Sequence, residues 1–299
     1  MSTVTISADM VRILREKTGA AMMDCKKALT ENAGDMDHSI KWLREKGIAS
    51  AEKKAGRAAS EGLAGIKVAG NEGVIVELNC ETDFVAKTDK FLALLGHATE
   101  AGLKQVASSH DAAAAAALKI VASDGQTIEE HVKSSIAALG ENMNLARVAR
   151  ISVKQGLLGS YKHSDGKMAA LVALECGKAD SSSKVEVIEL AKDLAMQIAG
   201  NLPPAEVVSR DQVSPELIAR EKEIALTQAT LAGAGKPANI IEKIAEGKLN
   251  KVLQEVTLLE QAFIKDPSVK IEALLKQVGD KVGDKLSVSG FIRIKVGVK

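Results

Sequence analysis

The chain has 299 residues, 46% of them apolar and 2% aromatic, which is enough for two or more aliphatic cores. A formal net charge of +1 argues against a protein whose main partner is nucleic acid. The cysteines form no Cys-x-x-Cys pair, which argues against a disulfide scaffold and a zinc site. The start lacks the pattern of a signal peptide, and no apolar run approaches the roughly 20 residues that span a bilayer. We therefore expect a soluble cytoplasmic protein without membrane contact.

Residues 1–47 predict three short helices. The residues suited to begin and end them are Ser7 and Gly19, Asp24 and Gly34, and Asp35 and Gly47. Met22 and Met23 lie side by side in a predicted loop between the first two helices. Methionine suits an adaptable binding surface, although one of the two could fill a gap in the core. We expect a small three-helix domain on a tether that runs to about residue 56.

An internal repeat follows this domain. A Gly-x-x-Gly segment, an apolar run and a cysteine recur in the same order, 94 residues apart at the glycines and 96 at the cysteines. Each copy continues into a helical pattern. The segments are Gly62–Gly65, Val74–Leu78, Cys80 and 90–101 in the first copy, and Gly156–Gly159, Ala170–Leu174, Cys176 and 184–199 in the second. The order predicts a duplicated unit of hairpin, central strand, loop and helix.

Further helices are predicted between and after these segments. An alanine-rich helix is expected at about residues 112–118, and Thr127 with Glu130 forms a capping-box pair. Ser214 and Pro215 suit the start of another helix. Its apolar stripe is followed by a Gly-Pro break and a second amphipathic helix, a pattern that predicts an antiparallel coiled-coil insertion. Alternating apolar residues from Leu286 to Val296 predict a closing hairpin strand.

The predicted fold is therefore α+β. The expected limits are 1–56 for the three-helix domain and linker, 57–144 for the first core subdomain, 145–209 with 255–299 for the second, and 210–254 for the coiled-coil insertion.

A search for catalytic motifs is negative. No Gly-rich loop has the spacing that cradles phosphates, and no pair of histidines has the helical spacing of metal ligands. No Gly-x-Ser-x-Gly nucleophile motif is present. An active site assembled from distant residues would escape such motifs. We expect no catalytic, metal or cofactor site, and a protein that acts by binding a partner.

The segment from Thr82 to Val85 is the strongest candidate contact. It follows the first central strand as a predicted loop, and the matching residues 177–180 of the second copy contain no aromatic. Phe84 is therefore not required by the structure that the copies share. Either it covers the following helix beside Phe91, or it is exposed and contributes about 1.5–3 kcal/mol when a partner buries it.

Four segments resemble the bacterial translation elongation factor Ts family. Residues 15–29 read REKTGAAMMDCKKAL and residues 79–86 read NCETDFVA, while GSYKH at 159–163 and GFIR at 290–293 extend the match across nearly the whole chain. The resemblance implies a ubiquitin-associated-like N-terminal domain, a core of two related α+β subdomains and an antiparallel coiled-coil insertion. It also implies guanine-nucleotide exchange, without enzymatic catalysis, on elongation factor Tu in its GDP-bound and nucleotide-free forms.

The resemblance further implies the roles of individual residues. Those expected to disturb the partner's Mg²⁺ site are Thr82, Asp83, Phe84 and Val85, and those expected to bind the partner are Leu14, Met22, Met23 and His163. No direct nucleotide or nucleic-acid contact is expected, and a homodimer or a 2:2 complex stays open. Some members carry a helical tail after the last strand, which we expect this chain to lack because it stops at Lys299. On the residues alone, a helical adaptor and a nucleotide-using enzyme remain alternatives.

Overall fold

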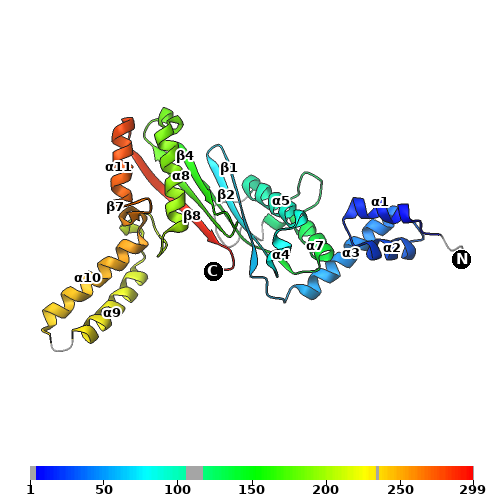
Figure 1. The fold of residues 1–299 in the computed structure, drawn as a ribbon, viewed down its shortest axis with the longest axis horizontal. Coiled ribbons are helices and arrows are strands. Elements are labelled where there is room, and N and C mark those ends of the chain that lie inside the picture. The colour runs from blue at the N-terminus through cyan, green and yellow to red at the C-terminus, as the bar shows by residue number, and fades with distance from the viewer. Residues whose placement is uncertain (1–4, 106–116, 234–235, 299) are drawn as a thin grey trace.

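The computed structural model describes residues 5–105, 117–233 and 236–298, and it mixes helices with small sheets, as the predicted α+β class requires. Figure 1 shows the N-terminal helices at one end, two sheets with their helices in the middle, and a helical hairpin that projects at the other end. Most of the predicted alanine-rich helix at 112–118 lies outside the described residues. Within the described part of the chain, no helix is long and apolar enough to cross a membrane.

Three helices form the N-terminal domain: α1 Ala8–Thr18, α2 Met22–Glu31 and α3 Met36–Lys54. The predicted caps at Ser7 and Asp35 are confirmed, since each side chain accepts a hydrogen bond from a backbone N–H of the first turn. The predicted cap at Asp24 is wrong. The N-cap is Ala21, and Asp24 lies inside the first turn of α2. Its negative charge interacts favourably there with the positive end of the helix dipole.

Helix α3 passes through Gly47, where the sequence suggested that it ends. Gly47 is buried where α3 crosses α7 Ile128–Leu139, and a Cβ added there would lie 3.5 Å from the Cβ of Ala137. Lys54, at the end of α3, donates to the carbonyl oxygen of Ile136 at 3.4 Å. Glycine thus allows a close helix crossing here, and the predicted tether is largely helix.

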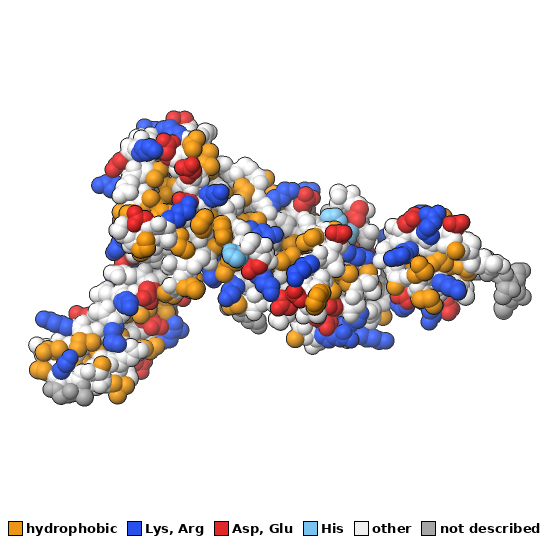
Figure 2. Space-filling model, in the orientation of Figure 1, with side chains coloured by type: hydrophobic (Ala, Val, Ile, Leu, Met, Phe, Trp, Pro, Cys, Tyr) orange, Lys and Arg blue, Asp and Glu red, His pale blue; other side chains and the backbone are white. Residues whose placement is uncertain are grey.

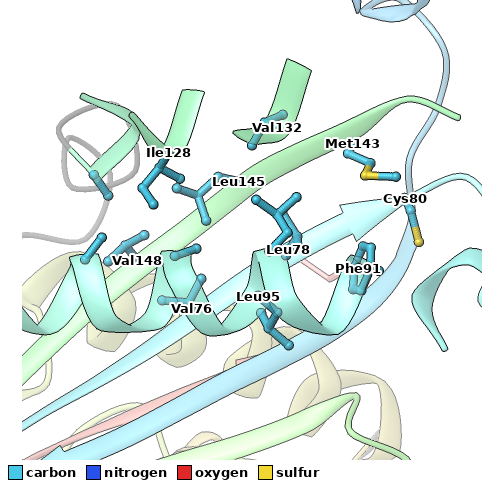
Figure 3. Packing of buried hydrophobic residues seen from close by; sticks show 14 of the residues in the cluster. Val76, Leu78, Cys80, Phe91, Leu95, Ile128, Val132, Met143, Leu145 and Val148 are labelled. Atoms are coloured by element: carbon cyan, nitrogen blue, oxygen red, sulfur yellow. The ribbon is translucent and has the colours of Figure 1, made fainter. Parts of the chain in front are cut away.

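The first core unit is an antiparallel sheet in the order β1-β2-β3, with β1 Glu61–Ala69, β2 Glu72–Cys80 and β3 Met143–Ser152. The helices of this unit are α4 Asp83–Ala86, α5 Asp89–Gln105 and α7. Figure 3 shows the packing between β2, β3, α5 and α7, where Val76, Leu78, Phe91, Leu145 and Val148 are buried together. The apolar run that predicted a central strand is therefore confirmed as β2.

The second core unit repeats this arrangement in the order β4-β5-β8, with β4 Gly156–Lys162, β5 Met168–Cys176 and β8 Leu286–Lys295. Its main helices are α8 Val185–Gly200 and α11 Ile271–Val282. The predicted closing strand is confirmed as β8. Ala173 pairs with Gly290 but Leu174 pairs with Val288, so the break in alternation at Ser289 is a bulge.

The two sheets stack face to face. Ile75 and Ala149 of the first sheet pack against Leu171 and Ile292 of the second. Because the main helices cover the outer faces, the core has a helix–sheet–sheet–helix arrangement. The first sheet has a register shift between Glu77 and Leu78, and the second has one 96 residues later in sequence, at the corresponding point of its central strand.

A helical hairpin interrupts the second unit. Its arms are α9 Pro215–Ala232, with Ser214 as the predicted N-cap, and α10 Ala238–Val256. The remaining elements are η1 Ala179–Ser183, η2 Arg210–Gln212, η3 Leu258–Glu260, β6 Ala262–Phe263 and β7 Asp266–Lys270. One expected domain limit, between residues 144 and 145, falls inside β3. Because β3 pairs with β2 along its length, this strand belongs to the first sheet.

Candidate interaction site

The segment after β2 is one turn of helix, α4, rather than the predicted loop. The Oγ1 of Thr82 accepts a hydrogen bond from the backbone N–H of Val85 at 3.4 Å, which caps the turn. Ala86 is buried in the first core cluster, and Val85 packs against that cluster. A cap at one end and apolar anchors at the other therefore fold this short segment.

Phe84 lies on the outer side of this turn and is 79% exposed. Phe91 is fully buried at the start of α5. The two aromatic side chains therefore have different environments, and the alternative in which Phe84 covers the helix beside Phe91 is wrong. The ring of Phe84 is therefore accessible to solvent and is not part of the core.

Asp83 stands beside Phe84 on the same turn. Its carboxylate accepts a hydrogen bond from the Nζ of Lys87 at 2.6 Å, one turn further along the chain. This bond is the main reason that the pKa of Asp83 lies below its ordinary value, and the positive charge of Lys167 acts in the same direction. Asp83 thus presents a negative charge next to the exposed ring at neutral pH.

Two adjacent residues after α7 hold the base of the turn. Glu141 accepts hydrogen bonds from the backbone N–H of Thr82 at 3.0 Å and from its Oγ1 at 2.6 Å. In the opposite direction, Glu81 accepts from the backbone N–H of Asn142 at 2.6 Å. No sequence pattern predicts this pairing, because some 60 residues separate the partners and no spacing rule joins them.

Cys80 lies beneath the same turn. Its Sγ donates to the carbonyl oxygen of Thr82 at 3.1 Å, and its side chain is fully buried. Burial is the main cause that raises the pKa of Cys80 to about 12, with the negative charge of Glu141 adding to it. The thiol is therefore uncharged and acts as part of the packing under the turn.

The N-terminal candidates divide into exposed and buried residues. Met22 is 59% exposed and Met23 is 72% exposed, both in the first turn of α2 rather than in a loop. Neither fills the core. Leu14 is 0% exposed and packs between the helices with Cys25 and Leu29. The expectation that Leu14 binds a partner directly is therefore corrected, since its side chain supports the domain from within.

His163 lies in the turn between β4 and β5, where it is exposed and its Nδ1 is 3.1 Å from the Oδ1 of Asp165. The turn contacts β1, because the backbone N–H of Ala64 donates to the carbonyl oxygen of Gly166 at 2.8 Å. Lys167, in the same turn, acts electrostatically on Asp83. The turn that carries His163 is therefore linked through β1 to the neighbourhood of α4.

A second link joins α4 to the N-terminal domain. The Nζ of Lys90, in the first turn of α5, donates to the carbonyl oxygen of Gly19 at 3.1 Å, just before the exposed methionines. In Figure 1, α4 lies between the N-terminal helices and the strands of the second unit. The exposed candidates thus belong to three neighbouring parts of one elongated molecule.

The rest of the described structure was searched for metal sites, grooves and apolar patches. Among the described residues, no group of three or more His, Cys, Asp or Glu side chains could hold a metal ion. An open groove of about 950 Å³ lies along α11 and β8 and includes Lys178 and Asp284. It is at the opposite end of β5 from His163. Figure 2 shows hydrophobic side chains scattered among charged ones on the surface in view, without one dominant patch.

An exposed aromatic side chain on a firmly held turn is typical of a protein that acts through contact with another protein. Comparison with known proteins identifies the family. The family model "Elongation factor TS" matches residues 81–298. The elongation factor Ts of Nitratidesulfovibrio vulgaris is 46% identical over 297 residues, covering 98% of this chain and 96% of that protein. That of Sinorhizobium medicae is 42% identical over 300 residues, with 98% and 94% covered.

The chain belongs to the elongation factor Ts family. The elongation factor Ts of a Nostoc species shows the same near full-length match, with 42% identity over 296 residues. Members of this family are guanine-nucleotide exchange factors for elongation factor Tu in translation elongation, and they are not enzymes in the usual sense. The resemblance inferred from the sequence motifs is thus confirmed.

Proposed function

We propose that this chain binds elongation factor Tu, in its GDP-bound and nucleotide-free forms, and that Thr82 to Val85 disturb the Mg²⁺ site of this partner. The observation that carries the proposal is the 79% exposure of Phe84 on a turn that is anchored on both sides. A turn whose backbone is held in place before contact loses less conformational freedom on association than a flexible loop.

The mechanism follows from thermodynamic linkage. A protein that binds the nucleotide-free partner more tightly than the GDP-bound partner must weaken GDP binding by the same factor. Phe84 inserts between elements of the partner, where its burial contributes about 1.5–3 kcal/mol. Asp83, ionised beside Lys87, shifts the groups around the Mg²⁺ ion. GDP then loses its contacts with the ion and leaves, so that GTP can bind, and no direct nucleotide contact by this chain is needed.

The remaining contacts are assigned to exposed residues near this turn. Met22 and Met23 dock on the nucleotide domain of the partner, and Leu14 supports them from the core of the three-helix domain. His163 contacts another domain of the partner from the turn between β4 and β5. Lys90 supports this assignment, because its bond to Gly19 holds the methionines near α4.

The chain also divides into domains. We assign residues 1–56 to a ubiquitin-associated-like domain, 210–254 to a coiled-coil insertion, and the rest to two related subdomains. The equivalent sheet orders and the matching register shifts favour duplication. The strand pairing favours a limit after Ser152 between the subdomains. A cytoplasmic location follows from the role in translation.

The test is the release of fluorescently labelled GDP from elongation factor Tu. Phe84→Ala and Asp83→Ala should each slow release at saturating concentration while the thermal unfolding of the chain is unchanged, since Phe84 is exposed and Asp83 is half-exposed. Val185→Ala is the matched control, because it truncates an exposed apolar side chain that is 65% exposed in the second unit. Full exchange activity in both variants would refute the assignment of this turn.

The same assay separates the alternative classes. A helical adaptor would bind elongation factor Tu without accelerating GDP release. A nucleotide-using enzyme would bind GDP or ATP in the absence of the partner, which titration of the isolated chain would reveal. We expect acceleration in the first measurement and no binding in the second.

A further inference from the structure

A four-residue helix such as α4 is not stable by itself. Fixing one turn of helix costs more conformational entropy than its few hydrogen bonds return. The backbone that presents Phe84 must therefore be held by the rest of the fold, and the contacts of Glu81 and Thr82 show where this happens.

The anchor consists of two adjacent residues on each side. Glu141 accepts both the backbone N–H and the Oγ1 of Thr82, at 3.0 and 2.6 Å. Glu81 accepts the backbone N–H of Asn142 at 2.6 Å, and the side chain of Asn142 donates to the carbonyl oxygen of Arg57 at 2.8 Å. Each segment thus fixes the backbone of the other, directly before α4 and directly before β3.

The carboxylate of Glu141 is suited to this position because both of its oxygens are used. A charged acceptor that takes two donors from one residue fixes orientation as well as distance. The Thr82 hydroxyl donates to Glu141 and accepts from the N–H of Val85, so one chain of hydrogen bonds runs from Glu141 into the first turn of α4. Phe84 lies inside that turn.

We infer that Glu141 is a positioning residue for Phe84, and that it acts on nucleotide exchange through Thr82 without touching the partner's nucleotide. The inference rests on the proposed function of the Thr82 to Val85 turn. A displacement of about 1 Å at an acting group can cost up to about 100-fold in rate, so a loosened turn should slow exchange strongly.

The experiment compares Glu141→Gln with Glu129→Gln in the full chain, using labelled GDP release from elongation factor Tu. The amide keeps one acceptor oxygen but directs an N–H₂ donor at a donor of Thr82. We expect the saturating release rate to fall about tenfold or more, with a much smaller change in the half-saturating concentration. Glu129→Gln is the control, because it removes the same negative charge from a nearby position in α7. Among the bonds described, the side chain of Glu129 contacts only Lys133.

Hydrogen exchange distinguishes positioning from general destabilisation. The amides of Thr82 and Val85 should exchange faster in Glu141→Gln, while those of β2 keep their protection. Thr82→Val removes the hydroxyl that donates to Glu141 and accepts from the N–H of Val85. Its effect on the rate of GDP release should be non-additive with that of Glu141→Gln, because the two variants share the bond between the hydroxyl and the carboxylate. Thr82→Ser, which keeps the hydroxyl, should preserve the protection of the Val85 amide.

The outcomes separate this inference from the function on which it rests. If Phe84→Ala slows GDP release but Glu141→Gln leaves both the release rate and the Thr82 amide unchanged, the positioning role is refuted alone. A uniform loss of amide protection in Glu141→Gln would also refute it, because the effect would then be on stability. If Phe84→Ala has full activity, the proposed function fails first.

Discussion

Phe84 and Leu14 show how burial assigns different roles to residues of similar chemistry. The resemblance assigns both residues to contact with the partner, yet Phe84 is 79% exposed and Leu14 is 0% exposed. The sequence left the fate of Phe84 open, because an aromatic beside a helix start can pack inward or outward. The resemblance implied a partner contact for Leu14, although its side chain packs with Cys25 and Leu29 in the small core of the three-helix domain.

Gly62 illustrates a residue whose role is purely conformational. Its φ of 142° lies in a region that other residues avoid, and an added Cβ would lie 2.1 Å from the carbonyl oxygen of Leu78. Gly62→Ala should therefore lower the free energy of unfolding by about 2–4 kcal/mol. Urea denaturation at an unchanged m-value would measure this.

Gly96 is the matched control for this prediction. It lies on the exposed side of α5, and nothing comes within 4 Å of an added Cβ. Gly96→Ala should stabilise the chain by about 0.5–1 kcal/mol, because alanine favours the helix. Equal effects of the two substitutions would show that the close approach at Gly62 is not limiting.

At the scale of elements, local sequence signals predicted where helices begin, but they did not predict which distant strands pair. The caps at Ser7, Asp35, Thr127 and Ser214 are confirmed, since each depends on a few neighbouring residues. Strand β3 escaped prediction altogether. Its register shift opposite Glu77 and Leu78 interrupts the alternation of apolar residues, so the two-residue period that reveals a strand is lost.

The helical hairpin is held together by small side chains. Ala225, Ala229 and Ala245 are buried in the seam between α9 and α10. Ala229→Leu should therefore force the arms apart and destabilise the hairpin by about 1–3 kcal/mol. Hydrogen exchange across residues 215–256 would report it, with the rest of the core unaffected. Thr227→Leu on the exposed side is the control, and equal deprotection in both variants would contradict the packing.

At the scale of the whole molecule, the internal repeat was the most informative sequence feature. It predicted two central strands, now β2 and β5, and the helices that follow them. It could not predict that the sheets stack on each other. Both faces of β2 and β5 are buried, so their apolar residues do not alternate with polar ones and the sequence does not show which face meets the other sheet. The role of Glu141 could not be predicted either, because its bonds to Thr82 form only when two distant segments come together in the fold.

The three cysteines probe three separate cores. Cys25, Cys80 and Cys176 are buried in the N-terminal domain, the first core unit and the second core unit respectively. Because the three-helix core is the smallest of these, it should open with the lowest free energy, and Cys25 should react first with a thiol reagent under native conditions. Mass spectrometry of the labelled chain would give the order. Faster labelling of Cys80 or Cys176 would contradict it.

The proposed mechanism of exchange depends above all on the exposed ring of Phe84, directly after β2. Its most direct test is the rate of labelled GDP release from elongation factor Tu at saturating concentrations of wild-type chain and of Phe84→Ala. We predict that the substitution slows release at least tenfold, equivalent to about 1.4 kcal/mol, while the thermal unfolding temperature stays the same. Release at the wild-type rate from a fully folded Phe84→Ala chain would contradict the account.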